Sequence, residues 1–316
     1  MNASPEGEAS EEPPVTNASP PPAERPAPPP AAEPVALSDA EVYPNAKRLA
    51  SEIAQKLTTY EAGDDLEEVV AVATNAEGAA LETLLDAAGP LLHRGAWSRG
   101  EVVYPQLGGA RPDRVSVMVL VQQTVGTATG TRIQHRTLDV RLRLAGDQWV
   151  FDALPSAGGD PPEDAAPLTA EAEAVLNDER IELPDSARWD ILAGGTSPDL
   201  LRLMSRIAER TPYAVLTLST GHPFEVFGTD RQSNHTKGRA VDIYRVGERD
   251  VIDDRSDSST SRDLVEWLFD DEAVTELGSP WALDGFGGRS FTDVVHADHL
   301  HVGVGPGGTP EERASP

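Results

Sequence analysis

Cysteine is absent from the 316 residues of this chain. A closed zinc site of the finger type, which needs cysteine thiolates, is therefore excluded. The absence does not indicate a compartment, because a chain without thiols is compatible with reducing and with oxidising surroundings.

Positive charge is scarce as well, since 26 lysines and arginines stand against 53 aspartates and glutamates, for a net charge of −27. Phosphate binding needs a clustered basic surface, so this balance argues against a nucleic-acid partner and against adsorption to an anionic membrane. We interpret the excess as a solvated acidic surface; an acidic patch that recruits a cationic partner is the alternative. No apolar run approaches the ~20 residues that cross a bilayer, so we expect no membrane span.

The start of the sequence lacks the basic segment and apolar core of a signal peptide. Residues 1–40 are instead rich in Pro, Ala, Ser and Glu, and burial cannot offset the entropy of ordering such a segment. We predict a disordered tether, as in the mature part of many exported or lipid-anchored bacterial proteins. The expected location is the cell envelope or the secreted fraction, with an export signal upstream of Met1, or the cytoplasm if Met1 is the true start.

The chain length is typical of two domains, and we expect an α+β fold for both. In residues 41–154, apolar residues at four-residue steps predict a helix from 42 to 62, with two more helices after it. Alternating apolar residues at 115–121 and 138–144 then predict an antiparallel sheet. This order is vaguely similar to the nuclear-transport-factor-like cone fold.

Residues 155–168 form a linker by their Pro and Gly content, which implies few contacts across it and a fragment from Thr169 that folds alone. In residues 169–305 we expect Ser197 and Ser261 to cap helices. Segments 213–218, 240–244 and 300–304 are expected to form strands of an antiparallel sheet with packed helices. Residues 306–316 are expected to be a disordered tail.

Three of the seven histidines fall in two clusters. His235 precedes Asp242 by seven residues, so that a loop and the strand 240–244 can converge on one ion. His299 and His301 are two residues apart, and side chains at such positions of a strand share a face. Two imidazoles, one carboxylate and a spare imidazole make an open zinc site, which leaves one position for water or substrate.

The run from Ser233 to Asp242, SNHTKGRAVD, resembles the S-x-H-x-x-G-x-A-x-D motif of the zinc D-Ala-D-Ala carboxypeptidases. His299-Leu300-His301 resembles the H-x-H of the wider lysostaphin, D-Ala-D-Ala peptidase and Hedgehog metallopeptidase superfamily. The likeness covers about residues 185–305 and implies a Hedgehog/D-Ala-D-Ala-peptidase-like fold there. It also implies that His235, Asp242 and His301 bind Zn²⁺. His299 would be the catalytic histidine that helps to activate water or to stabilise a tetrahedral intermediate.

Two positions depart from the family pattern. Many members carry Arg or Gln in an S-G-Y-R-S-like turn that orients the substrate, whereas residues 219–223 read STGHP and place His222 there. Some members have a glutamate base before the last zinc histidine, where this chain offers His296, Asp298 and His299. His222 either touches substrate or is structural, and His296 is either an outer partner of the site or solvated. Asp298 either accepts from a ligating imidazole or is a solvated loop residue.

The leading hypothesis is a zinc-dependent peptidase that hydrolyses peptide bonds of peptidoglycan stem peptides or cross-links. The alternative is a zinc-binding, non-catalytic module of the cell envelope, as occurs among Hedgehog-type members. A third reading is a regulatory envelope protein whose first domain binds a partner. The intact His299 favours the enzyme, and the sequence leaves the cleaved bond open.

Overall fold

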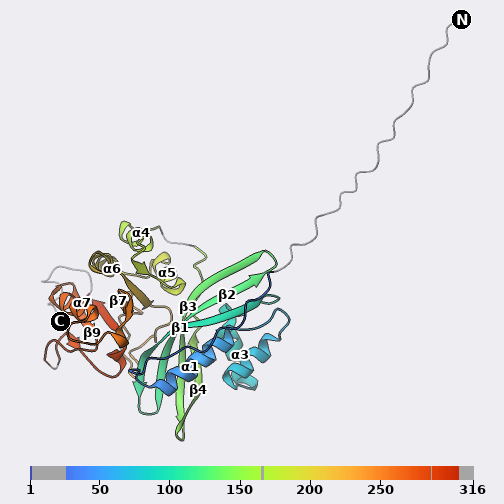
Figure 1. Ribbon diagram of the computed structural model, residues 1–316, viewed down its shortest axis with the longest axis horizontal. Coiled ribbons are helices and arrows are strands. Elements are labelled where there is room, and N and C mark those ends of the chain that lie inside the picture. The colour runs from blue at the N-terminus through green and yellow to red at the C-terminus, as the bar shows by residue number, and fades with distance from the viewer. Residues whose placement is uncertain (2–25, 165–166, 286, 306–316) are drawn as a thin grey trace.

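Two β-sheets, each with its own helices, organise this computed structural model, which describes residues 1, 26–164, 167–285 and 287–305 (Figure 1). The first sheet has four antiparallel strands, the second is mixed, and seven α-helices lie in the described part of the chain. The predicted α+β class is therefore confirmed. Residues 2–25 of the predicted tether and the whole predicted tail lie outside the described residues.

Three helices precede the first sheet, as predicted, namely α1 (Pro44–Leu57), α2 (Leu66–Thr74) and α3 (Gly78–Ala88), with the 3₁₀ turn η1 (Gly89–Leu91) after them. Helix α1 buries apolar residues three or four positions apart, which is the pattern of a helix packed on a core: Ala46, Ala50, Ile53, Ala54 and Leu57. Pro44 suits the first turn of α1, because the amide N–H that it lacks has no partner there.

The first sheet is a meander of β1 (Trp97–Arg111), β2 (Arg114–Thr127), β3 (Gly130–Ala145) and β4 (Gln148–Ser156). Strand β2 is buried on both faces. Its odd-numbered valines from 115 to 121 pack in the core with the helices, whereas Met118 and Leu120 pack against Leu216 and Tyr244 of the second sheet. The first sheet therefore forms one side of the boundary between the two halves of the molecule, which we call the N-terminal unit (residues 41–156) and the C-terminal unit (residues 169–305).

Strand β1 is absent from the sequence prediction. Pro105 and the glycines at 100, 108 and 109 interrupt its apolar alternation, and proline is rare inside strands. The strand tolerates them because it has β2 on one side only and its register shifts between Val102 and Tyr104 and again between Leu107 and Gly109. At Gly109 a Cβ would lie 2.2 Å from Phe227 of the C-terminal unit, so the two units approach closely there.

The second sheet has the strand order β10-β9-β11-β7-β6-β5, with β8 (Arg249–Asp250) paired to β7. The inner strands are antiparallel to one another: β6 (Tyr213–Thr217), β7 (Ala240–Val246), β9 (Val274–Gly278) and β11 (Leu300–Val304). The prediction of an antiparallel sheet is wrong at the edges, because β5 (Ile181–Glu182) and β10 (Ser290–Phe291) run parallel to their neighbours. Between β5 and β6 the chain crosses through two helices, and such a connection allows a parallel return.

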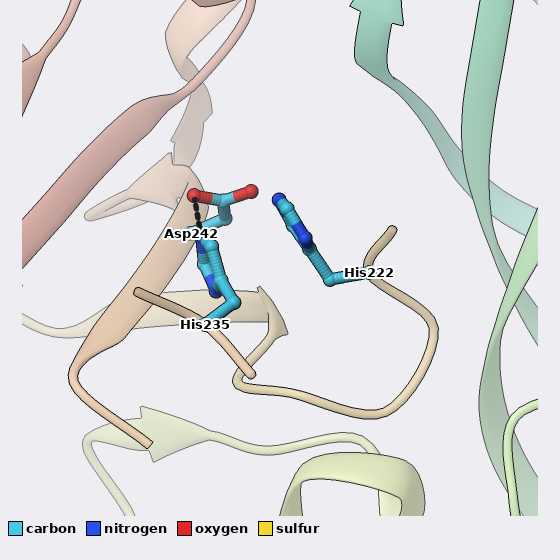
Figure 2. Close-up of side chains that lie close together, drawn as sticks. All are labelled: His222, His235 and Asp242. Carbon is cyan, nitrogen blue, oxygen red and sulfur yellow. Dashed lines mark hydrogen bonds and ion pairs between the residues drawn. The ribbon is translucent and has the colours of Figure 1, made fainter. Parts of the chain in front are cut away.

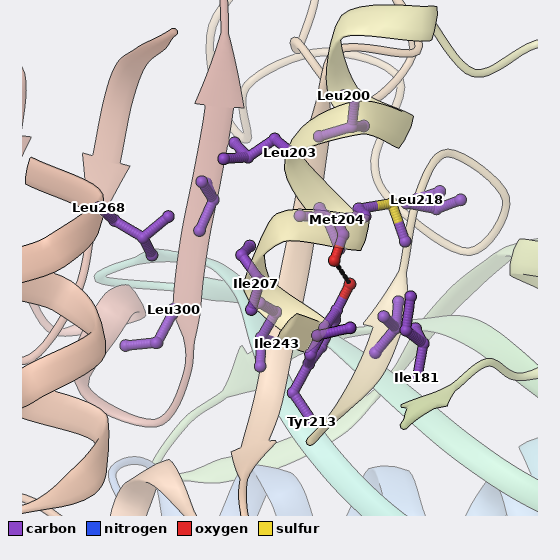
Figure 3. Close-up of a cluster of buried hydrophobic side chains, with 14 of the residues drawn as sticks. Ile181, Leu200, Leu203, Met204, Ile207, Tyr213, Leu218, Ile243, Leu268 and Leu300 are labelled. Carbon is purple, nitrogen blue, oxygen red and sulfur yellow. Dashed lines mark hydrogen bonds between the residues drawn. The ribbon is translucent and has the colours of Figure 1, made fainter. Parts of the chain in front are cut away.

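The helices of the C-terminal unit are α4 (Ala170–Leu176), α5 (Asp185–Leu192), α6 (Pro198–Arg210) and α7 (Thr260–Asp270), with the 3₁₀ turns η2 (Val251–Asp253) and η3 (Val295–Ala297). Ser197 caps α6 as predicted, but α7 is capped by Ser259, whose hydroxyl accepts from the Arg262 amide, and not by Ser261. Figure 3 shows the side chains of α6 within the core of this unit, where Tyr213 donates to the Met204 carbonyl oxygen at 3.0 Å.

The prediction of few contacts between the two units does not hold. Apolar side chains of both sheets share one buried cluster, and the Thr137 hydroxyl of β3 donates to the Leu216 carbonyl oxygen of β6 at 2.6 Å. Strand β4 also continues to Ser156, inside the segment predicted as a linker. The boundary is thus a packed interface.

Part of the predicted tether is described and lies along the N-terminal unit. Residues 26–37 contain no helix or strand. Their backbone carbonyls accept four side-chain hydrogen bonds, from Trp97 Nε1 to Pro26 (2.6 Å), from Arg99 Nε to Pro29 (2.7 Å) and from Gln55 Nε2 to Ala32 (2.8 Å) and Glu33 (3.5 Å). Among the helices of the described ranges, none combines the length and the apolar character that crossing a bilayer requires.

Candidate metal centre

Strands β7 and β11 bring the predicted metal ligands together. They pair in a register that sets His301 directly opposite Asp242, and the loop before β7 carries His235 back to them. Asp242 Oδ1, His235 Nε2 and His301 Nδ1 form a triangle with sides of 3.0, 3.0 and 3.1 Å. All three side chains are buried, with residue exposures of 0% for His235, 1% for Asp242 and 8% for His301.

A glycine turn allows the loop to place His235. Gly238 has φ of +67°, and a Cβ on it would lie 1.9 Å from the Gly195 carbonyl oxygen, so no larger residue fits. The Gly238 amide donates to the His235 carbonyl oxygen at 2.8 Å, and the His235 amide donates to the Ser233 hydroxyl at 3.2 Å. The serine and glycine of the sequence motif thus shape the loop that presents the imidazole.

On the side that faces away from the triangle, hydrogen bonds determine which nitrogen of His235 and of His301 remains to bind an ion. A carbonyl oxygen can only accept, so His235 Nδ1 carries the proton that it donates to Leu218 at 2.5 Å. His301 Nε2 donates to Glu276 Oε2 at 3.3 Å. His235 Nε2 and His301 Nδ1 are therefore the nitrogens left to bind an ion in the triangle, an arrangement that outer partners commonly impose on metal-bound histidine.

The triangle has the size that a small divalent ion needs. Its corners lie 3.0–3.1 Å apart, and nitrogen and oxygen ligands bind zinc at ~2.0–2.1 Å, so the three atoms are close enough together to share one ion. The buried charges agree. Glu41, Asp242 and Asp298 are buried against the buried Lys47, with exposures of 9% or less, so a divalent cation would offset the excess of negative charge that remains when His301 is deprotonated.

His222 also lies at this centre, although the sequence does not mark it as a ligand. Its ring stacks on His235 with centroids 4.0 Å apart, and its Nδ1 donates to the Pro223 carbonyl oxygen at 2.7 Å. Figure 2 shows the ring beside Asp242 and His235, and the ligand atoms of the three residues lie within 4.8 Å of one another. The His222, His235 and Asp242 group could hold a metal ion.

The turn that carries His222 is held from two sides. Asp190 of α5 accepts hydrogen bonds from the Ser219 and Thr220 amides, each at 2.9 Å. Gly221 has φ of +92°, and a Cβ there would lie 2.3 Å from the Thr137 carbonyl oxygen of β3. The position of His222 therefore depends on the half-buried Asp190 carboxylate and on the close approach of the N-terminal unit, and neither is visible in the local sequence.

His299 stands beside the triangle, as the sequence predicts, with its Nε2 3.7 Å from Asp242 Oδ2. Its Nδ1 donates to Asp298 Oδ1 at 2.6 Å, so Nε2 carries the free lone pair. Asp298 is fully buried and is not the solvated loop residue that one reading of the sequence allowed. It accepts from His299 and not from a ligating imidazole, so the second alternative does not hold either.

Charge interactions and hydrogen bonds outweigh burial in setting the pKa values of Asp242 and His301. Burial alone would raise the pKa of Asp242, but His235 and His299 hold it well below its usual value. Burial would lower the pKa of His301, but its hydrogen bonds to Asp242 and Glu276 raise it to about 9. His301 therefore carries a proton at neutral pH until a metal displaces it.

The centre opens into a pocket of about 310 Å³. His222 and His301 line it from the C-terminal unit, while β1 supplies residues 108–111, including Arg111. His296 lines the pocket as well, with its ring edge-on to Phe291 at a centroid distance of 4.8 Å. A substrate that reaches the triangle therefore contacts both units.

Comparison of the chain with protein-family models, with curated proteins and with solved structures found no match.

Removal of one corner of the triangle should abolish tight metal binding. We expect His235→Ala, Asp242→Ala and His301→Ala each to weaken Zn²⁺ or Co²⁺ binding by more than the ~10–100-fold that loss of an outer partner costs. Competition with a chromogenic chelator measures this. His135→Ala, on β3, is the matched control and should bind as the wild type does. Full metal occupancy in any of the three ligand variants would contradict the assignment.

Metal binding should depend on pH through His301. Its pKa of about 9 means that the imidazole must lose a proton before Nδ1 can bind an ion. Apparent affinity should therefore rise about tenfold per pH unit up to about pH 9, with release of about one proton per ion. Chelator competition from pH 6.5 to 8.5 and proton release in weak buffer test this, and an affinity that does not change with pH over this range is the contrary result.

Proposed function

We propose that this protein is a zinc-dependent peptidase that hydrolyses peptide bonds of peptidoglycan stem peptides or cross-links. The observation that carries the proposal is the triangle of His235, Asp242 and His301, open to a pocket and flanked by the oriented His299. Zn²⁺ bound there would polarise a carbonyl group and lower the pKa of a bound water towards ~7.

The chain's own residues supply orientation and proton transfer. His235 Nε2 and, once deprotonated, His301 Nδ1 would bind the ion, and Asp242 would contribute one negative charge, which would leave a zinc ion with a net positive charge. His299 has its Nδ1 proton held by Asp298, so Nε2 is the atom that takes or returns a proton on the substrate side. General acid–base groups of this kind contribute ~10²–10⁴-fold to the rate.

The pocket supports a peptide substrate that bears carboxylates. Arg111 and Arg231 both line it, on opposite units. The Arg111 guanidinium donates to the carbonyl oxygens of Phe227 and Gly228, and Arg231 lies 3.8 Å from Glu276. Stem peptides of peptidoglycan are short and carry free carboxylates, which guanidinium groups can bind.

The proposal also includes a specific fold for each of the two units. We infer a Hedgehog/D-Ala-D-Ala-peptidase-like fold for residues 169–305, because the sequence motif falls on β7, its preceding loop and β11. The three helices and the meander of residues 41–154 support a nuclear-transport-factor-like unit. The proposed location is the cell envelope or the secreted fraction, where peptidoglycan lies.

His222 favours a second candidate, a zinc-binding module without catalytic activity. Structural zinc sites are closed by four protein ligands, whereas catalytic sites keep one position for water. A fourth bond from His222 would close this site. The absorption spectrum of the Co²⁺ protein separates the two, because His222→Ala changes it only if His222 is a ligand.

Hydrolysis is tested on isolated peptidoglycan. We expect the zinc-loaded protein to release peptide or amino-acid fragments that mass spectrometry identifies, and treatment with a chelator to stop the release until Zn²⁺ is restored. The fragments also define the cleaved bond. Zinc-loaded protein that binds stem peptide and leaves it intact over long incubation would establish the non-catalytic module instead.

Substitution of His299 separates catalysis from metal binding. Its nitrogens contact carboxylates and are outside the triangle, so His299→Ala should keep the metal content of the wild type. The turnover number should fall by roughly 10²-fold or more. Asp298→Asn, which keeps the shape but weakens the hold on His299, should give a smaller loss. Loss of metal in His299→Ala would make His299 a ligand and contradict the assignment.

A further inference from the structure

Strand β1 of the N-terminal unit reaches the metal centre through Gln106. This side chain is fully buried, and its Nε2 donates to Asp242 Oδ2 at 2.7 Å. The other oxygen, Oδ1, faces His235 and His301. The carboxylate is therefore divided, with one oxygen held by the N-terminal unit and one left for the ion.

Helix α1 reaches the same centre through Lys47. The fully buried ammonium lies 2.5 Å from Asp298 Oδ2, which also accepts from the Leu107 amide at 3.0 Å. Asp298 Oδ1 accepts from His299. Two of the three donors that hold Asp298 thus come from the N-terminal unit.

Further contacts hold Lys47 itself in place. Glu41 pairs with it, and Tyr104 of β1 donates to Glu41 Oε1 at 3.2 Å. The Tyr104 ring stacks on Tyr244 of β7 with centroids 5.1 Å apart. The chain of contacts therefore runs from α1 and β1 to the carboxylate that orients His299.

Adhesion between the units does not need these polar groups. The cluster of Met118, Leu120, Leu216 and Tyr244 already seals the interface with apolar side chains. Buried charges cost free energy unless they are fully paired, so they are a poor means of holding two surfaces together. Because the buried polar groups of the N-terminal unit gather around Asp242 and Asp298, their role is to be sought in the metal centre.

We propose that the N-terminal unit is part of the metal centre, with Gln106 positioning the ligand Asp242 and Lys47 positioning His299 through Asp298. The inference rests on the proposed metal-dependent function. It assigns a role to the N-terminal unit that no motif of its sequence indicates. The division of labour is specific, since Gln106 acts on metal binding and Lys47 on turnover.

The first test compares two buried glutamines in the full-length protein. Gln106→Leu should weaken Co²⁺ and Zn²⁺ binding about 10–100-fold, as loss of an outer partner typically does, and should shift the Co²⁺ absorption bands. Gln123→Leu is the control, because Gln123 is also fully buried in the first sheet but donates to Leu91 and Ser98. If Gln106→Leu does not fold, Gln106→Met, with a side chain of similar length, serves in its place.

The second test concerns Lys47. Lys47→Met should lower the turnover number of peptide hydrolysis at least tenfold, with KM and metal content unchanged. Lys56→Met makes the same change at an exposed position of α1 and should have no effect. Lys47→Arg, which keeps the charge, should restore part of the turnover.

The outcomes distinguish this inference from the proposed function. A wild-type protein that binds neither Zn²⁺ nor Co²⁺ overturns the proposed function. Wild-type metal binding that Gln106→Leu leaves unchanged, or that Gln123→Leu weakens equally, overturns the role of Gln106. A Lys47→Met variant with wild-type turnover, or one that loses metal and activity together, overturns the role of Lys47.

Discussion

The two oxygens of the Asp242 carboxylate carry opposite demands. Oδ1 must stay free of protein donors so that it can face an ion between His235 and His301, while Oδ2 must be satisfied because the group is buried. Gln106 meets the second demand from the other unit. The register of β7 and β11, the loop of His235 and the position of β1 all have to agree around this one group.

Sequence reasoning reaches the parts of the site whose signals are local. His235 and Asp242 lie seven residues apart on a loop and a strand that periodicity identifies, and the strand of His301 is equally plain. Pairing of that strand with β7 is a short step, since both are buried and apolar. The three helices of the N-terminal unit, with α6 and α7, are predictable for the same reason, because their apolar spacing records the face that they bury, whereas α5 is absent from the sequence prediction.

The remainder depends on contacts between distant segments. Gln106 is 136 residues from Asp242 and sits in a strand that Pro105 and its glycines conceal. Lys47 occupies a helical position that reads as ordinary surface, yet it is fully buried. Burial of a single polar residue leaves no repeating pattern in the sequence, so the flanking residues do not reveal that the other unit covers it. The expectation of few contacts between the two units is wrong for this reason.

The order of the strands along the chain determines when the metal centre can form during synthesis. Strand β11 comes last in the chain among the described strands, yet it lies in the middle of the second sheet between β9 and β7. During synthesis, residues near the amino end fold first. The sheet thus stays split, and His301 is missing from the site, until the ribosome has released this strand. The growing chain therefore presents the complete triangle of His235, Asp242 and His301 only after β11 has emerged.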